Sequence, residues 1–494
     1  MERSEIIFYI LVVFASWFIL LYMLKKIGKK YGLEASFPLL IWKTEKGKNL
    51  IDRISKKFDW KYYGNISILI CILAMTITTY LILRNAIISF SLPVERAPSP
   101  RLMLGIPGIN PIIPVGYGVI ALAIAMVIHE FSHGILARYG GIKIKSLGLI
   151  FLILPIGAFV EPDEERLKRA KKIKRGRVFA SGPTSNIIVA IVCIILLSFL
   201  SMNIVAKEEG LIVSNPAFGM ERGDIITNIE GSKIKSLKDF QEIEKEMVPG
   251  NFYNISNKKI VFGAYINRVE KNYPAEKYGI VEGSIIYEIN GNKIKNWSDF
   301  YRVMNETKAY QEIEIKYFLN DFRNAIVILE NKYNYTHKSE DEGKGFLGIS
   351  VLGLNDIVIE PNYYKNLLNP LTKSNFGSYL NKFLNFITFP FYGLSPFPED
   401  LAKAFSCTPV FWISYNLIYW IFWLNFALGA FNSLPLLPLD GGYILKDSIS
   451  FLFSRSKKAE KISSIASKFV SILILFMILS IIFVPYIRLI FSSL

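Results

Sequence analysis

The sequence predicts a polytopic α-helical membrane protein with about six transmembrane helices and an extracytoplasmic α+β insert. Three observations support this fold class. Of the 494 residues 52% are hydrophobic, and several apolar runs reach the roughly 20 residues that cross a bilayer. Lys and Arg crowd into alternate loops between these runs. A motif in the more polar central part of the chain recurs 60 residues further on.

Hydropathy places the six spans at about 6–24, 64–83, 114–138, 184–203, 409–431 and 464–491. Basic residues are dense in 25–61, in 138–177 and in 446–461. Because Lys and Arg mark cytoplasmic loops, these three regions are expected inside the cell. The loop 85–113, the whole of 205–408 and both termini then lie outside.

Two apolar segments do not fit this alternation of spans and loops. Leu147 to Val160 is too short to span, and we expect a membrane-dipping hairpin beside the third span. Tyr379 to Leu394 carries Lys382 and is expected to be an interfacial helix. If this second segment spanned the membrane, the orientation of the C-terminal part would invert.

The net charge of +16 raises the question of a nucleic-acid partner. The basic residues do not form one patch but lie next to the spans, which is the pattern of membrane orientation. No nucleic-acid partner is therefore expected, and the lipid bilayer is the expected environment.

The third span contains the most informative pattern of the chain, His129-Glu130-Phe-Ser-His133. Positions four apart share a helix face, so His129 and His133 can hold one metal ion. Glu130 lies beside them and can accept a proton from water. Ionisable residues at membrane depth are costly and usually functional, so the pattern favours a metal site over a structural role.

The repeat in the insert has the form Gly-x-Ile-Ile-x-x-Ile-x-Gly, once from Gly223 and again from Gly283. Each copy is typical of a strand, a turn, a short strand and the start of a helix. The run resembles the centre of PDZ domains, and the segment from Ala275 to Gly279 is similar to the PDZ helix that precedes it. PDZ domains bind chain ends by adding a strand to a sheet edge. A rigid plug without ligand is the alternative interpretation.

Three motifs together resemble the site-2 protease family of intramembrane zinc metalloproteases. They are the His129 to His133 pattern, Ser181-Gly-Pro-Thr-Ser-Asn186, and the segment from Asn432 to Asp440-Gly441 that contains Pro435 and Pro438. Pro438 lies one place later than the family's second proline is expected. The family also carries PDZ-like domains on the outer side between the second and third motifs. Residues 1–113 lie outside the shared part.

The resemblance implies one catalytic Zn2+ ion held by His129, His133 and Asp440, with Glu130 as the catalytic residue. Asn186 and Asn432 are candidates for stabilising the transition state or positioning the substrate, with a helix–loop hydrogen bond as the alternative for each. Asp440 has a second interpretation as the N-cap of a helix that begins near Tyr443.

The predicted organisation has seven parts. They are 1–62, first span and basic cytoplasmic loop; 63–113, second span and outer loop; 114–204, N-terminal half of the catalytic core; 205–262 and 263–345, the two PDZ-like domains; 346–408, an outer linker with the interfacial helix; and 409–494, C-terminal half of the core.

The function expected from this reading is an intramembrane zinc metalloendopeptidase that hydrolyses peptide bonds in or near transmembrane segments of other membrane proteins. A catalytically inactive adaptor that binds outer chain ends is the alternative, and the intact motif set argues against it. A CAAX-type peptidase would use Glu as third ligand, and a transporter would need midplane charges on more helices. An upstream protease acting on the same substrate is a possible partner. The active site is expected near the cytoplasmic face of the cell membrane.

Overall fold

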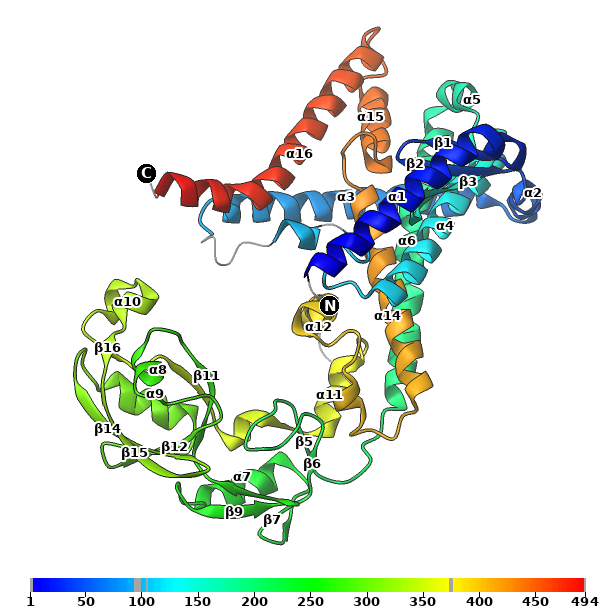
Figure 1. The fold of residues 1–494 in the computed structure, drawn as a ribbon. Coiled ribbons are helices and arrows are strands. Elements are labelled where there is room, and N and C mark those ends of the chain that lie inside the picture. Colours follow the sequence, from blue (N-terminus) through cyan, green and yellow to red (C-terminus); the bar gives the residue numbers. More distant parts are fainter. Residues whose placement is uncertain (1–2, 93–98, 104, 373–375, 493–494) are drawn as a thin grey trace. The chain divides into compact units, whose positions relative to one another are not determined.

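Long apolar helices dominate the parts of the chain that flank the insert (Figure 1). The computed structural model describes residues 3–92, 99–103, 105–372 and 376–492. Within that part, five helices are long and apolar enough to cross a membrane: α3 (Trp60–Ser89), α4 (Val115–Tyr139), α6 (Lys172–Met202), α14 (Pro409–Asn432) and α16 (Ala459–Ser492). The predicted first span falls on α1 (Arg3–Ile27). The chain is a multi-pass membrane protein, and a sixth span stays a prediction.

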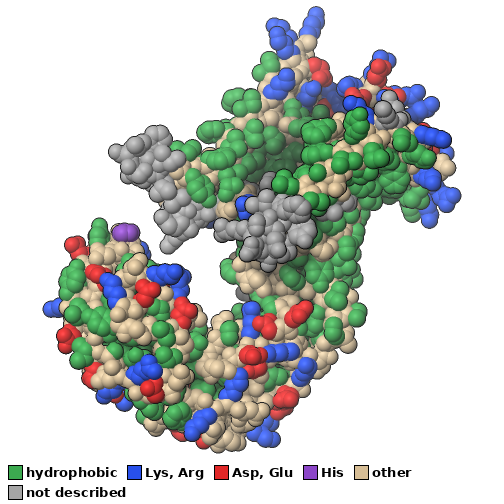
Figure 2. All heavy atoms as spheres, viewed as in Figure 1, with side chains coloured by type: hydrophobic (Ala, Val, Ile, Leu, Met, Phe, Trp, Pro, Cys, Tyr) green, Lys and Arg blue, Asp and Glu red, His purple; other side chains and the backbone are tan. Residues whose placement is uncertain are grey.

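The residues divide into two compact units. The first comprises Met1–Leu197 and Ser414–Leu494, and the second is Ser198–Ile413. In the first unit large apolar side chains remain exposed along the helices, for example Leu69 on α3, Ile191 on α6 and Phe469 on α16. Figure 2 shows this hydrophobic covering, whereas charged side chains of both signs are mixed over the insert. Exposed apolar faces of this extent match a lipid environment.

A four-stranded antiparallel sheet lies beside α4 in the first unit. Its order is β1-β2-β3-β4, formed by β1 (Leu33–Ser36), β2 (Leu39–Thr44), β3 (Ile144–Leu152) and β4 (Leu154–Pro162). The hairpin predicted for Leu147 to Val160 is confirmed as β3 and β4. A side chain at Gly148 would lie 2.4 Å from both the Phe159 ring and the Trp42 carbonyl oxygen, so only glycine permits this close strand packing.

The sequence did not reveal that the basic loop 25–62 supplies half of this sheet. β2 pairs with β3 over Leu40–Thr44 and Phe151–Leu147. The loop also contains α2 (Lys48–Lys57), which buries Ile51 against Leu147 and Val160. The Asp52 carboxylate on α2 accepts two hydrogen bonds from the Arg138 guanidinium at the end of α4. The N-terminal extension is therefore packed onto the helix that carries the His-Glu-x-x-His pattern.

Helix α6 begins about twelve residues before the predicted start of the fourth span, at Lys172, directly after α5 (Glu164–Arg169). Its first turns are too polar to be recognised by hydropathy, but they dock on α15 (Asp440–Leu452) because Arg175 forms an ion pair with Asp447. Pro183 consequently lies inside the helix and not at its start. The Ser181 to Asn186 motif is thus presented from a continuous helix.

The insert contains the two repeats as nested α+β folds. The Gly-containing turns are equivalent: Glu230 and Asn290 adopt φ +48° and +47°, and Gly231 and Gly291 both adopt φ +80°. The following helices start alike, since Ser236 caps Asp239 N–H and Asn296 caps Asp299 N–H. The predicted repeat of strand, turn, strand and helix is confirmed in both copies.

The first repeat comprises β5 (Leu211–Val213), β6 (Ile225–Ile226), β7 (Asn228–Ile229), β8 (Ser232–Lys233), α7 (Leu237–Glu246), β9 (Phe252–Ile255) and β10 (Lys258–Val261). The second comprises β11 (Ala264–Val269), α8 (Pro274–Lys277), β12 (Ile285–Ile289), β13 (Asn292–Lys293), α9 (Trp297–Asn305), β14 (Glu312–Leu319), β15 (Asp321–Ile328), β16 (Glu330–Asn331), α10 (Tyr333–Thr336), β17 (Gly345–Phe346) and β18 (Ile349–Leu352).

The second repeat interrupts the first. After β18 the chain returns to the first repeat, where β19 (Val358–Ile359) pairs with β5, and Leu354, Ile357 and Val358 join the first hydrophobic core. The second core ends at Val351. The boundary expected at 345 therefore differs from the structure, because local pattern cannot show that a two-residue strand pairs across an inserted fold.

Short helices follow the repeats: α11 (Pro361–Leu368), α12 (Phe376–Thr388) and α13 (Glu399–Ala402). The segment predicted as an interfacial helix forms α12, which has 13 residues and is too short to span. The two ends of the insert meet within the second unit, since Ala206 bridges Phe405 and Lys207 N–H donates to the Ala404 carbonyl.

Candidate metal centre

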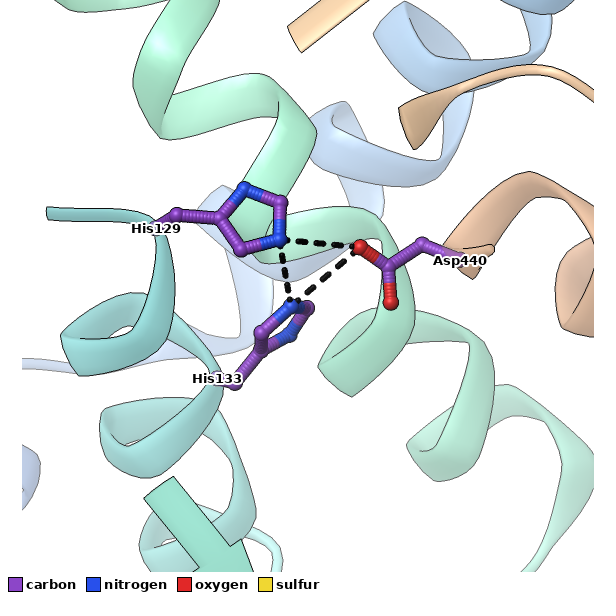
Figure 3. A group of neighbouring side chains, drawn as sticks. All are labelled: His129, His133 and Asp440. Carbon is purple, nitrogen blue, oxygen red and sulfur yellow. Dashed lines mark hydrogen bonds and ion pairs between the residues drawn. The ribbon is translucent and has the colours of Figure 1, made fainter. Parts of the chain in front are cut away.

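Two helices bring three ligand atoms together. His129 and His133 project from α4, and Asp440 projects from the first turn of α15 (Figure 3). The two Nε2 atoms lie 3.1 Å apart, and Asp440 Oδ2 lies 3.1 Å from His129 Nε2 and 3.3 Å from His133 Nε2. Among the described residues this is the one group of at least three His, Cys, Asp or Glu ligand atoms with the spacing of a metal site.

The spacing fits a tetrahedral zinc site. Zinc bonds nitrogen and carboxylate oxygen at about 2.0–2.2 Å, which separates neighbouring ligands in a tetrahedron by roughly 3.3 Å. Two imidazoles and one carboxylate also form the donor set of a catalytic site, which keeps a fourth position open. The three side chains are mostly buried, with exposed fractions of 8%, 14% and 14%.

Asp440 does not cap the helix that it begins. The N-cap of α15 is Leu439, and no side chain caps that end. The preceding segment, with Pro435 and Pro438, separates α14 from α15 as the sequence predicted, and Ser471 on α16 accepts a hydrogen bond from Leu437 N–H. The aspartate carboxylate is thereby directed toward the histidines.

The second ring nitrogen of each histidine has a partner from α6. His133 Nδ1 lies 2.7 Å from the Val178 carbonyl oxygen, so Nδ1 carries the proton and Nε2 is free to ligate. His129 Nδ1 lies 3.4 Å from the Asn186 amide, whose Oδ1 has no other partner. Rotating the Asn186 amide by 180° exchanges its nitrogen and its oxygen. Oδ1 would then accept a hydrogen bond from His129 Nδ1–H.

Gly182 leaves the space that the two imidazoles occupy. A Cβ there would lie 2.5 Å from His133 Nε2 and 2.7 Å from His129 Nε2. Any larger residue at this position would displace the ligand atoms. The glycine of the Ser181 to Asn186 motif is therefore explained by the close approach of α6 to the site.

Glu130 is adjacent to the three ligands without belonging to them. Its Oε2 accepts a 2.9 Å hydrogen bond from Val160 N–H on β4. It lines a cavity of about 300 Å³ together with the three ligands, Asn432 and Pro438. The structure therefore places Asn432 at this cavity, whereas Asn186 faces the ring of His129.

Sequence reasoning missed the contribution of α3, which lies outside the three motifs. Tyr63 Oη donates to the Ser181 carbonyl, Thr184 Oγ1 donates to the Ser67 carbonyl, and Cys71 Sγ lies 3.6 Å from Ser433 Oγ. These contacts fix two motif segments against one helix. In the sequence, this role of α3 is indicated only by Tyr63, Ser67 and Cys71, which interrupt an otherwise apolar run.

Comparison with known proteins decides the family. The model of peptidase family M50 matches residues 117–477. This chain belongs to peptidase family M50. The predicted relationship to site-2 proteases is confirmed, and the family makes the chain a metalloprotease for which zinc is the implied metal.

Two relatives cover more than half of the chain, and the name of the second fits this assignment. An "Uncharacterized protein" of Methanocaldococcus jannaschii is 37% identical over 264 residues, which is 52% of this chain and 68% of that relative. A "Putative zinc metalloprotease" of Clostridium perfringens is 22% identical over 362 residues, 71% of this chain and 87% of that relative.

Solved structures similar to part of the chain include PDZ domains of SdrC-like proteins. The domain from Listeria innocua is 25% identical, covers 18% of this chain and 92% of its own, and has a TM-score of 0.15. That from Listeria monocytogenes is 24% identical, with 19% and 92% coverage and a TM-score of 0.16. The PDZ-like character of the insert rests on its own strands and helices.

Proposed function

We propose that this M50 protein is an intramembrane zinc metalloendopeptidase that hydrolyses peptide bonds in or near transmembrane segments of other membrane proteins. The observation that carries the proposal is the position of Glu130, next to three converging ligand atoms and hydrogen-bonded to strand β4. When bound, zinc supplies Lewis-acid activation of water and of the peptide carbonyl.

Glu130 moves the proton in this mechanism. Val160 N–H holds Oε2, so the carboxylate is oriented while one oxygen remains to accept a proton from the attacking water. The same carboxyl then donates the proton to the leaving amine nitrogen. Asn432 at the cavity wall is the better-placed candidate for an amide donor to the developing oxyanion, and Asn186 is better placed to orient His129.

A helical substrate hides its peptide bonds and must be unwound before cleavage. β4 is an edge strand, because β3 pairs one of its sides and no strand of the described residues pairs the other. An extended substrate segment that pairs with this edge would lie beside Glu130 and keep its backbone groups hydrogen-bonded within the membrane.

The orientation belongs to the same proposal. We infer that the insert and both termini lie outside the cell and the metal near the cytoplasmic face, because basic residues gather on α2, α5 and the start of α6. Reporter fusions at Asn331 should read as extracytoplasmic. A cytoplasmic reading at that position would reverse the orientation and move the metal toward the opposite face.

The second repeat offers a groove for a chain end. Edge strand β18 and helix α9 enclose about 200 Å³, lined by Trp297, Tyr301, Lys332, Lys344, Ile349 and Val351. Lys332 and Lys344 share the carboxylate of Asp341, which leaves one positive charge for a terminal carboxylate. This arrangement supports capture of an outer chain end that an upstream protease exposes.

The first repeat is less suited to binding a chain end. Its helix α7, which corresponds to α9 of the second repeat, is already hydrogen-bonded to the segment that follows β18. Leu237 N–H at the start of α7 donates to the Glu360 carboxylate, and Gln241 donates to Asn355. We therefore assign the first repeat a structural role. The insert as a whole would act as a gate, meaning that it excludes substrates with large extracytoplasmic domains.

The test uses the full chain in proteoliposomes with a single-span reporter. The parent should bind one zinc and cleave, and a chelator should stop cleavage. Glu130→Gln should keep the zinc and lose about 100-fold or more of the rate, since general acid–base catalysis contributes at least that factor. Zinc-loaded parent protein without any cleavage would favour the inactive adaptor instead.

A further inference from the structure

A second cavity adjoins the one that contains the metal ligands, and Glu130 and Val160 line both of them. Its volume is about 170 Å³, and its walls include Trp42, Val127, Phe131, Leu149 and Ala158. Thr44 and the exposed Lys46 belong to the same lining. The cavity is thus mainly apolar and adjoins the proposed catalytic carboxylate.

The cavity is formed by one face of the sheet and one face of α4. Trp42, Leu149 and Ala158 form a cross-strand row, because Trp42 pairs with Leu149 and Leu149 pairs with Ala158. On α4, Val127 and Phe131 are four residues apart and therefore lie on the same face. Ala158 is the smallest side chain of the row, so it leaves the space empty.

We propose that this cavity is the specificity pocket of the protease and receives a large apolar side chain, such as Leu, Met or Phe, from the residue beside the cleaved bond. The inference rests on the proposed function and names the substrate feature that it selects. Because Glu130 lines both cavities, a substrate whose peptide bond lies at the metal can direct a neighbouring side chain into this one.

Size and polarity set the selection. An apolar cavity of roughly 150 Å³ holds a benzene ring in a protein core, so the available volume suits a ring or a branched aliphatic chain. A carboxylate side chain would be buried among apolar walls beside the carboxylate of Glu130, at a high cost in free energy. Alanine would leave the pocket unfilled and lose the favourable burial.

Trp42 gives the pocket a wall from outside the matched family region. It lies on β2, whereas the M50 match begins at residue 117. The N-terminal extension therefore contributes to side-chain selection as well as to the sheet.

The first test measures kcat/KM of the full chain on reporters that carry Ala, Leu, Phe or Asp beside the mapped cleavage position. The parent should prefer Leu and Phe over Ala and Asp by tenfold or more. Ala158→Leu fills the pocket and should reverse the preference between Phe and Ala. Gly157→Ala is the matched control, because a Cβ there lies 3.5 Å from Ile150 on the opposite face, an ordinary contact.

Two outcomes contradict the pocket assignment. One is a parent enzyme that cleaves all four reporters equally. The other is Ala158→Leu lowering cleavage of every reporter by the same factor, with zinc content unchanged.

The second test does not depend on catalysis. In the Glu130→Gln background, Ala158→Cys should form a disulfide with a reporter whose single cysteine stands beside the cleavage position, and Gly157→Cys should not. Equal crosslinking from both positions would overturn the pocket. If Ala158→Cys crosslinks in this background but the zinc-loaded parent, with Glu130 intact, never cleaves a reporter, the proposed function is rejected and the binding site is kept.

Discussion

At the scale of single residues, the site depends on side chains that are far apart in sequence but fixed by local geometry. His129 and His133 share one helix face, and Asp440 joins them because prolines interrupt the chain before α15. Helix spacing in the sequence predicted His129 and His133 as a pair of ligands, whereas Asp440 was predicted from the resemblance to site-2 proteases. The partners of the second ring nitrogens, Val178 and Asn186, required the structure because they depend on how α6 packs.

Asp440→Ala should lower zinc affinity by more than about 100-fold, since even partners outside the ligand shell are worth 10–100-fold. Metal analysis after dialysis against a zinc buffer series measures the effect. Asp447→Ala on the same helix is the control, because its carboxylate binds Arg175 and does not face the ligands. An Asp440→Ala variant that binds zinc and cleaves like the parent would place the third ligand elsewhere.

The substitution Asn186→Ala distinguishes the two roles considered for Asn186, orientation of His129 and stabilisation of the oxyanion. If Asn186 orients His129, zinc affinity should fall about 10- to 100-fold and saturating zinc should restore much of the rate. If it stabilises the oxyanion, zinc affinity should stay unchanged while kcat falls about 100-fold or more. We expect the first result. The second result would show that Asn186 stabilises the transition state and does not orient His129.

At the scale of elements, hydropathy located the five long helices well because lipid demands long apolar runs. It missed the first turns of α6 and the contribution of β1 and β2. The apolar run in β2, Leu39–Trp42, is far too short to be recognised as a span. Pairing of β2 with β3 joins segments about a hundred residues apart, and no local pattern specifies such a register. The nested strand β19 was missed for the same reason.

The segment between α10 and β17 is held by a pair of lysines. Lys332 and Lys344 hydrogen-bond to Asp341 and lower its pKa to about 2. A folded-state pKa below the usual 3.8 means that Asp341 stabilises the fold above about pH 4. That contribution is lost as the pH falls from about 4 toward 2.

Hydrogen exchange of residues 332–345 measures this effect. Asp341→Asn should exchange faster than the parent at pH 6, and the two proteins should converge as the pH approaches 2. Glu340→Gln, whose side chain is exposed, is the control and should behave like the parent at pH 6. A difference between Asp341→Asn and the parent that persists unchanged at pH 2 would contradict the charge argument.

At the scale of the whole molecule, the chain combines a membrane-embedded unit that carries the metal ligands with an insert whose ends meet. Because Ala206 bridges Phe405, residues 208–403 can be replaced by a short Gly-Ser linker without pulling α6 and α14 apart.

The deletion of 208–403 should leave zinc content unchanged and allow cleavage of reporters that keep a large outer domain. The measurement compares trimmed and untrimmed reporters in the parent and the deletion variant. If the variant binds zinc but cleaves neither reporter, the insert delivers substrate and the gate proposal is wrong.

We expect Glu130 and the three metal ligands to cleave a peptide bond within the membrane. Mass spectrometry of the products of a single-span reporter in proteoliposomes shows where the chain is cut. The new chain ends should map inside the transmembrane segment, toward its cytoplasmic half, and should be absent with Glu130→Gln. Ends that map only to soluble flanking sequence, or the same products from Glu130→Gln, would contradict the claim.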